Sequence, residues 1–287
     1  YEYAEGNTFA TANLIAGTEA ITADLLKAYQ EKGGSEANIA AGYHAIEFLL
    51  WGQDFNTDPK AAGLRSYTDF VQGTACTHKH CDRRAQYLKV TTDLLVNDLK
   101  QMQQEWAPDQ ANYRKSFLAL QDTEALRRIL FGMGSLSLGE LAGERMNVAL
   151  LAHSQEDEPS CFSDNTHHDI LNNIQGINNV FHGSYQRMDG KIIKGASLAE
   201  LLATKDKALS NELATKLSLT KTAAEEIVKA AENGEPFDQQ IAAENKAGNA
   251  RVQATISALR NQTATIEAAA KVLGVSHLNP ETSDSLQ

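Results

Sequence analysis

The sequence predicts an all-α protein made of two packed helical bundles of the four-helix type. Three observations support this fold class. The 287-residue chain has only five prolines, its long segments are rich in residues of high helix propensity, and its apolar residues recur at helical intervals. No segment alternates apolar and polar residues as an exposed strand would. We therefore expect about eight to ten helices.

The first helices are expected to carry the chain to a break near residue 108. Residues 8–31 are expected to form one amphipathic helix, and Ser35 is a natural N-cap for a helix that ends at Gly52. A long helix is expected over residues 84–105, and Ala107-Pro108-Asp109 ends it. The predicted domains are residues 1–108 and 109–287.

The second domain is expected to begin with a long helix over residues 126–151 that is rich in small side chains. A polar loop over residues 155–169 follows, in which Ser163 or Asp164 would cap the next helix. The chain from Ser197 to Gly274 then has the apolar spacing of amphipathic scaffold helices, the first of them expected over residues 198–217. A faint internal repeat relates the two domains, because each has a glycine-bearing helix followed by an aromatic–hydroxyl–Asp triplet.

The charge of the whole chain counts against two classes of partner. The formal net charge is −11 and the isoelectric point is near 5.2. This balance argues against nucleic acid and against an anionic membrane surface, and it is compatible with cations. No apolar run reaches the roughly 18 residues of a transmembrane segment. The chain begins at Tyr1 rather than Met, so we expect an export signal to have been removed.

The three cysteines point to an oxidising compartment. Cys76 and Cys81 lie close together in the sequence, and a disulfide between them requires a loop rather than a regular helix. We favour that disulfide over free thiols or a metal site. Cys161 is then left as a small buried side chain.

The helix before Gly52 carries the strongest candidate site. From Ala37 to Gly52 the only charged residue is Glu47, so the helix is expected to be buried, with Trp51 in the core. His44 and Glu47 are three residues apart and therefore neighbours on one face. A buried carboxylate must be paired, protonated or bound to a cation. The pair is thus either part of a metal site or a polar junction between packed units.

Neither His-Glu-x-x-His nor His-x-x-Glu-His occurs here, so any remaining metal ligands must come from other segments. The second domain contains acidic and histidine side chains that could be those ligands, and each of them also has a structural interpretation. Glu144 is a ligand or the partner of Arg145 in an ion pair. Asp164 is a ligand or an N-cap, and His167 is a ligand or an exposed residue of a first helical turn. Glu156, Asp157 and Glu158 are expected to form a solvated acidic turn.

Four separated segments resemble the imelysin family, also called the M75 peptidases or the iron-regulated protein A group. The first is Gly42-Tyr43-His44-Ala45-Ile46-Glu47, which resembles the Gly-x-His-x-x-Glu signature of that family. The others are Arg83-Arg84-Ala85-Gln86-Tyr87-Leu88, Gly143-Glu144-Arg145-Met146 and Cys161-Phe162-Ser163-Asp164-Asn165-Thr166-His167, in the same order along the chain. His168 departs from the pattern, where we expect arginine.

The resemblance implies two helical bundles with the signature near their junction. It also implies a protein that is exported to the periplasm or associated with the outer membrane, and a lipid anchor would be compatible with this location. It implies His44 and Glu47 as metal ligands, with Glu144, Arg145, Asp164 and His167 as neighbours; we add Asp169, which ends the polar run. The expected metal is iron, divalent or trivalent, with zinc as the second choice.

Three functions remain open at this stage. The first is an envelope protein that binds a metal ion or metal complex, in iron uptake or regulation, together with envelope partner proteins. The second is an M75-type metallopeptidase in which Glu144 is the general base; the absence of a standard zincin motif counts against it. The third is a non-catalytic module that binds a polymer or a protein. We favour the first and expect no general protease activity.

Overall fold

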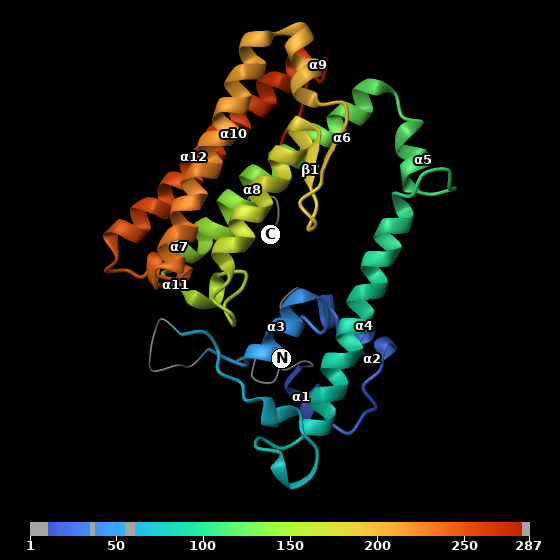
Figure 1. Cartoon of the computed structure of the whole chain (residues 1–287), viewed down its shortest axis with the longest axis vertical. Coiled ribbons are helices and arrows are strands. Elements are labelled where there is room, and N and C mark those ends of the chain that lie inside the picture. Colours follow the sequence, from blue (N-terminus) through green and yellow to red (C-terminus); the bar gives the residue numbers. More distant parts are fainter. Residues whose placement is uncertain (1–10, 35–37, 55–60, 283–287) are drawn as a thin grey trace. The chain divides into compact units, whose positions relative to one another are not determined.

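The computed structural model describes residues 11–34, 38–54 and 61–282. It divides into two compact units, a first unit over residues 1–116 and a second unit over residues 117–287 (Figure 1). The sequence placed this boundary after residue 108. The all-α class is confirmed, because the regular secondary structure of the described residues is helical, apart from two strands of three residues each. No helix among them is long and apolar enough to cross a membrane.

The first unit consists of short helices around one long helix. These elements are α1 (Thr11–Ala16), α2 (Ala23–Tyr29), η1 (Lys32–Gly34), α3 (Tyr43–Trp51), η2 (Tyr67–Phe70), η3 (Gly73–Ala75) and α4 (Cys81–Glu105); α5 (Tyr113–Leu118) spans the boundary. The single helix predicted over residues 8–31 is wrong, because the chain turns between α1 and α2 and Thr22 caps α2 through its side chain. The predicted N-cap Ser35 lies outside the described residues, and α3 begins directly after Gly42.

The second unit is a bundle of four long helical segments. Its elements are α6 (Asp122–Ser135), η4 (Leu136–Val148), α7 (Ala149–Ala152), η5 (Gln155–Asp157), α8 (Thr166–His182), β1 (Ser184–Gln186), β2 (Ile192–Lys194), α9 (Leu198–Lys205), α10 (Lys207–Glu232), α11 (Phe237–Ile241) and α12 (Lys246–Val272). The first three follow one another directly as a single rod, of which η4 is π-helical. This rod packs with α8 and α12, and α10 packs with both of these helices, so the four-helix description fits this unit.

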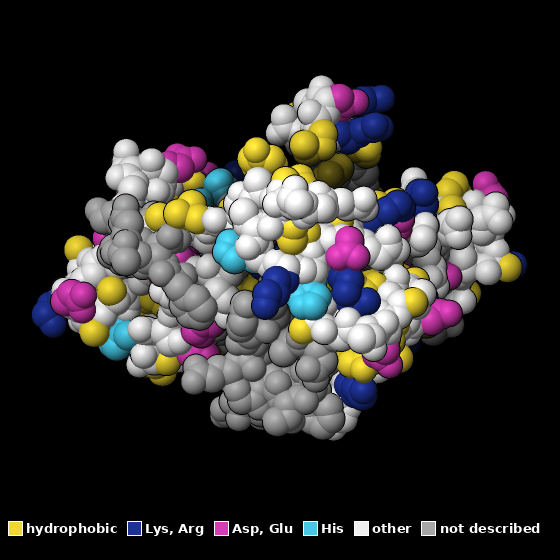
Figure 2. All heavy atoms as spheres, turned by 90° about the horizontal axis from the view of Figure 1, so that it is seen from below, with side chains coloured by type: hydrophobic (Ala, Val, Ile, Leu, Met, Phe, Trp, Pro, Cys, Tyr) yellow, Lys and Arg dark blue, Asp and Glu magenta, His cyan; other side chains and the backbone are white. Residues whose placement is uncertain are grey.

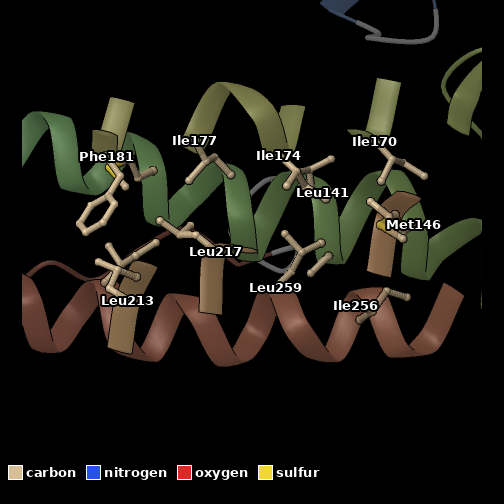
Figure 3. Packing of buried hydrophobic residues seen from close by; sticks show 14 of the residues in the cluster. Leu141, Met146, Ile170, Ile174, Ile177, Phe181, Leu213, Leu217, Ile256 and Leu259 are labelled. Atoms are coloured by element: carbon tan, nitrogen blue, oxygen red, sulfur yellow. The ribbon is translucent and has the colours of Figure 1, made fainter. Parts of the chain in front are cut away.

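A continuous hydrophobic core joins the four segments of the second unit. Figure 3 shows side chains from η4, α8, α10 and α12 converging on one layer: Leu141, Met146, Ile170, Ile174, Ile177, Phe181, Leu213, Leu217, Ile256 and Leu259. Burial of this apolar surface, at about 25 cal/mol per Å² removed from water, is the main source of the bundle's stability.

Two features of the second unit differ from the sequence prediction. Asp206 breaks the helix expected over residues 198–217, because its carboxylate accepts the backbone N–H of Leu209 (2.9 Å) and so begins α10. β1 and β2 form an antiparallel hairpin in which Tyr185 lies opposite Ile193. Three residues per strand are too few to produce a recognisable alternation of polar and apolar residues.

Candidate functional site

Helix α3 presents His44 and Glu47 on one face. The Nδ1 atom of His44 lies 2.8 Å from Oε2 of Glu47. Glu47 is only 8% exposed, whereas the His44 side chain is 41% exposed. The carboxylate is therefore held inside the unit, while the imidazole reaches solvent.

The expectation that α3 is buried on all sides is wrong. Ala45, Phe48 and Leu49 are buried together with Glu47, but Tyr43, Leu50 and Trp51 are exposed. Trp51 is therefore not a core residue. An apolar composition cannot distinguish a buried helix from one that packs on a single side, because that depends on how many neighbours the fold supplies.

Both ends of α3 depend on glycine. Gly42, directly before the helix, has φ 90°, and Gly52, directly after it, has φ 76°. L-residues with side chains rarely adopt these conformations. The backbone just before Gly42 is fixed by side chains: Gln30 Oε1 accepts the N–H groups of Ala40 (2.9 Å) and Ala41 (3.1 Å). The Tyr87 hydroxyl donates to the carbonyl of Ala40 (2.7 Å).

A buried polar network lies beside α3. Asp69 accepts hydrogen bonds from Thr77 Oγ1 (2.6 Å) and Arg65 Nη1 (3.3 Å), and its Oδ1 lies 2.7 Å from Nδ1 of His78. Burial alone would raise the pKa of Asp69, but the hydrogen bonds with Thr77 and His78 outweigh it and lower that pKa. The same Arg65 places its guanidinium 5.4 Å from the ring centroid of Phe48 in α3.

The segment from Arg83 to Leu88 was singled out in the sequence only by its resemblance to the family. In the structure, its side chains hold other parts of the backbone in place by hydrogen bonds. Arg83 donates to the carbonyls of Leu14, Ile15 and Glu19 at 2.6–2.9 Å, and thereby fixes the end of α1. Arg84 is completely buried and donates to the carbonyls of Asp69 (3.0 Å) and Lys79 (3.2 Å). These residues position the loops around α3 and do not form a site themselves.

A disulfide joins Cys76 and Cys81. It closes a loop that contains Thr77 and His78, and so holds both side chains against Asp69. Cys161 is not in a disulfide and is half-buried. The expectation that it is fully buried is therefore wrong.

In the second unit, Arg145 pairs with Glu140 rather than with Glu144. Its Nη2 atom donates to Glu140 Oε2 (2.6 Å) and its Nη1 atom to Asn173 Oδ1 (3.2 Å). The π-helical winding of η4 explains the difference, because its wider turn brings residues five apart onto one face. Glu144 Oε1 is buried without a hydrogen-bond partner among the described residues. The ion pair between Glu144 and Arg145 is therefore absent.

Asp164 belongs to a cluster of three carboxylates. One oxygen each from Glu158, Asp164 and Asp238 lie within 4.8 Å of one another, and Glu158 and Asp238 are buried. The solvated acidic turn predicted around Glu158 is therefore wrong for that residue. The predicted capping role of Asp164 is also wrong, since Asn165 is the N-cap of α8. Sequence reasoning missed Asp238, which lies in the first turn of the short helix α11, far along the chain.

The other candidates of this segment have separate partners. His167 is half-buried, and burial together with the neighbouring His168 holds its pKa below the usual value. The two imidazole rings are 4.2 Å apart. Asp169 accepts a hydrogen bond from Ser160 Oγ (2.5 Å). A single ligand set drawn from His44, Glu47, Glu144, Asp164 and His167 includes both units and stays a prediction.

The comparisons with known proteins identify the family. No curated protein matches the chain. The family model described as Imelysin, peptidase M75, matches residues 8–266, which is most of the sequence and includes α3, η4 and the carboxylate cluster. The chain therefore belongs to the imelysin family.

Proposed function

We propose that this imelysin is an exported envelope protein that binds a metal ion, iron before zinc, in iron uptake or regulation. The observation that carries the proposal is the His44–Glu47 pair, whose Nδ1 and Oε2 atoms are 2.8 Å apart. Nitrogen and oxygen ligands bound at about 2.1 Å to one ion lie about 3 Å apart when they are adjacent at a right angle. A metal ion can therefore replace a shared proton here with little movement.

The carboxylate cluster supports cation binding independently. Three carboxylates whose oxygens lie within 4.8 Å repel one another when ionised. A cation bound among them would offset that repulsion, and oxygen-rich sets favour hard cations, among them iron ions. The net charge of −11 adds a general attraction for cations.

Metallopeptidase activity is the alternative, and one observation favours it. A general base needs a carboxylate that is not already committed to a cation, and Glu144 Oε1 is buried without a hydrogen-bond partner among the described residues. Against this alternative, the chain lacks the His-Glu-x-x-His arrangement with which many zinc peptidases join two ligands and a base on one helix.

The test is metal content by mass spectrometry of untagged protein after incubation with iron and with zinc. We expect bound metal in the wild type. Because a single altered ligand or supporting residue typically costs 10–100-fold in affinity, His44→Ala/Glu47→Ala should weaken binding at least 100-fold. Glu158→Gln/Asp164→Asn tests the carboxylate cluster separately.

The matched control is His277→Ala/Glu244→Ala, which removes an exposed histidine and an exposed glutamate and should leave metal content unchanged. A wild type without metal after both incubations would contradict the proposal. The search would then move to polymers and partner proteins. Hydrolysis of a peptide library that requires both metal and Glu144 would instead establish the alternative.

A further inference from the structure

The β1–β2 hairpin is an exposed projection from the second unit. Its turn is closed by backbone bonds from Arg187 N–H to the carbonyl of Lys191 and from Gly190 N–H to that of Arg187, both 2.9 Å. At its base, Gly195 N–H donates to the carbonyl of Gly183 (2.8 Å). Residues 185–196 are all exposed, so both faces of the hairpin contact solvent.

The hairpin carries apolar side chains that the fold does not bury. Met188, in the turn, is fully exposed, and Tyr185, Ile192 and Ile193 are each about half exposed or more. A two-stranded hairpin without a covered face is only marginally stable in water. A concentration of exposed apolar side chains on such an element marks an interaction site.

The charge of the hairpin is opposite to that of the chain. Arg187, Lys191 and Lys194 are basic, and the one acidic residue, Asp189, lies 3.7 Å from Arg187. The segment over residues 183–196 is thus net positive in a chain of net charge −11. On the face of the molecule drawn in Figure 2, Lys and Arg side chains are interspersed with Asp and Glu.

Screening keeps the acidic body from cancelling the charge at the tip of the hairpin. The six residues from Gly183 to Met188 are joined by five steps, which span at most about 16 Å at about 3.3 Å per step. The Debye length at physiological salt is about 8 Å. The tip is therefore more than one screening length from the base of the hairpin.

We propose that this hairpin docks on an anionic lipid surface. Met188 and Ile192 would enter the boundary between headgroups and acyl chains, and Arg187, Lys191 and Lys194 would contact lipid phosphates. The combination selects this occupant. A soluble polyanion would use the three cations and not the apolar side chains, and a protein strand added at the edge would use the backbone and need no cations. The proposal does not depend on metal binding.

The experiment is flotation of the full chain with vesicles of phosphatidylcholine alone and of phosphatidylcholine mixed equally with phosphatidylglycerol. We expect binding to the anionic vesicles only, weakened by salt. Each basic residue at an anionic surface strengthens binding by about fivefold. Arg187→Gln/Lys191→Gln/Lys194→Gln should therefore weaken binding on the order of 100-fold, and Met188→Ser/Ile192→Ser at least about tenfold.

The matched control, Lys205→Gln/Lys207→Gln/Lys271→Gln, makes the same change of charge at exposed lysines elsewhere in the second unit and should bind as the wild type does. Because all the altered side chains are exposed or nearly so, thermal unfolding should be unchanged. A wild type that stays off anionic vesicles overturns the proposal. Two other results overturn it as well: an equal loss of vesicle binding in the lysine control, or full vesicle binding by Met188→Ser/Ile192→Ser. Either result would mean that the vesicles attract the protein through its charge alone and not through this hairpin's combination of basic and apolar side chains.

Discussion

The two units of this protein hold their folds by different means. In the second unit, long helices meet along a continuous apolar core, and all members of that core cluster among the described residues come from this unit. In the first unit, α4 is the only long helix described, and much of what holds the loops is polar: Arg83, Arg84 and Tyr87 bind backbone carbonyls of segments far away in the sequence. The signature helix α3 lies in the unit held by polar side chains.

This difference shows how a short helix can be fixed without a large core. Isolated helices of fewer than about 12 residues are unstable in water, and α3 has nine. Side-chain hydrogen bonds to backbone are directional and fix position, whereas apolar contacts tolerate small shifts. The first unit therefore gains a defined position for His44 and Glu47, and it should be more sensitive to the loss of a single polar group.

The largest expected effect comes from Arg84→Met. Arg84 is fully buried and donates to three loop carbonyls, those of Asp69, His78 and Lys79. The variant therefore leaves acceptors unpaired and should cost about 3–5 kcal/mol. Hydrogen exchange resolved by segment should show lost protection in the first unit. The matched control is Leu217→Ala, which should cost about 2–5 kcal/mol by forming a cavity in the second unit.

Equal loss of protection in both units after Arg84→Met would contradict the comparison. It would show that the polar clamps and the apolar core stabilise one cooperative structure rather than two compact units.

The second effect is that of the disulfide. Cys76 and Cys81 are five residues apart in the sequence, and closing so short a loop restricts the unfolded chain by about 2 kcal/mol. Cys76→Ser/Cys81→Ser should therefore lower the stability of the first unit by about that amount and free Thr77 and His78 from Asp69. Urea unfolding with and without reductant measures it. Reductant should change the wild type and leave the double variant unaffected, because Cys161 is not in a disulfide.

Long periodic segments were the most predictable part of the fold. The helix expected over residues 84–105 is α4, three residues longer at its start, because many turns of amphipathic sequence define one helix. Short helices were not predictable to the same degree. The break between α1 and α2 depends on Arg83, which is more than 60 residues away in the sequence, and no local pattern contains that contact.

The candidate site divides in the same way. The contact between His44 and Glu47 could be predicted because a spacing of three makes neighbours on any helix. The Glu140–Arg145 pair could not, since it requires π-helical winding. The association of Asp164 with Glu158 and Asp238 could not either, because it depends on how α11 packs in the second unit.

The smallest of the three effects concerns pH and again separates the units. The pKa of Asp69 is lower in the folded protein than in the unfolded chain, so its ionised form stabilises the first unit. That contribution is complete above about pH 4, the unfolded value, and is lost as the pH falls through the lower folded value. On acidification, the first unit should lose hydrogen-exchange protection, and Asp69→Asn should remove most of this dependence.

Glu124 in the second unit is the control for this prediction. Hydrogen bonds from Arg127 and Arg128 lower its pKa to about 2, yet the three side chains lie at the surface, where solvent screens such pairs. Glu124→Gln should therefore leave acid stability almost unchanged. Suppose instead that Glu124→Gln shifted the acid transition as much as Asp69→Asn does. The effect of Asp69 on acid stability would then not come from its burial within the polar network of the first unit. The contrast between the two units would then lie in their apolar cores alone.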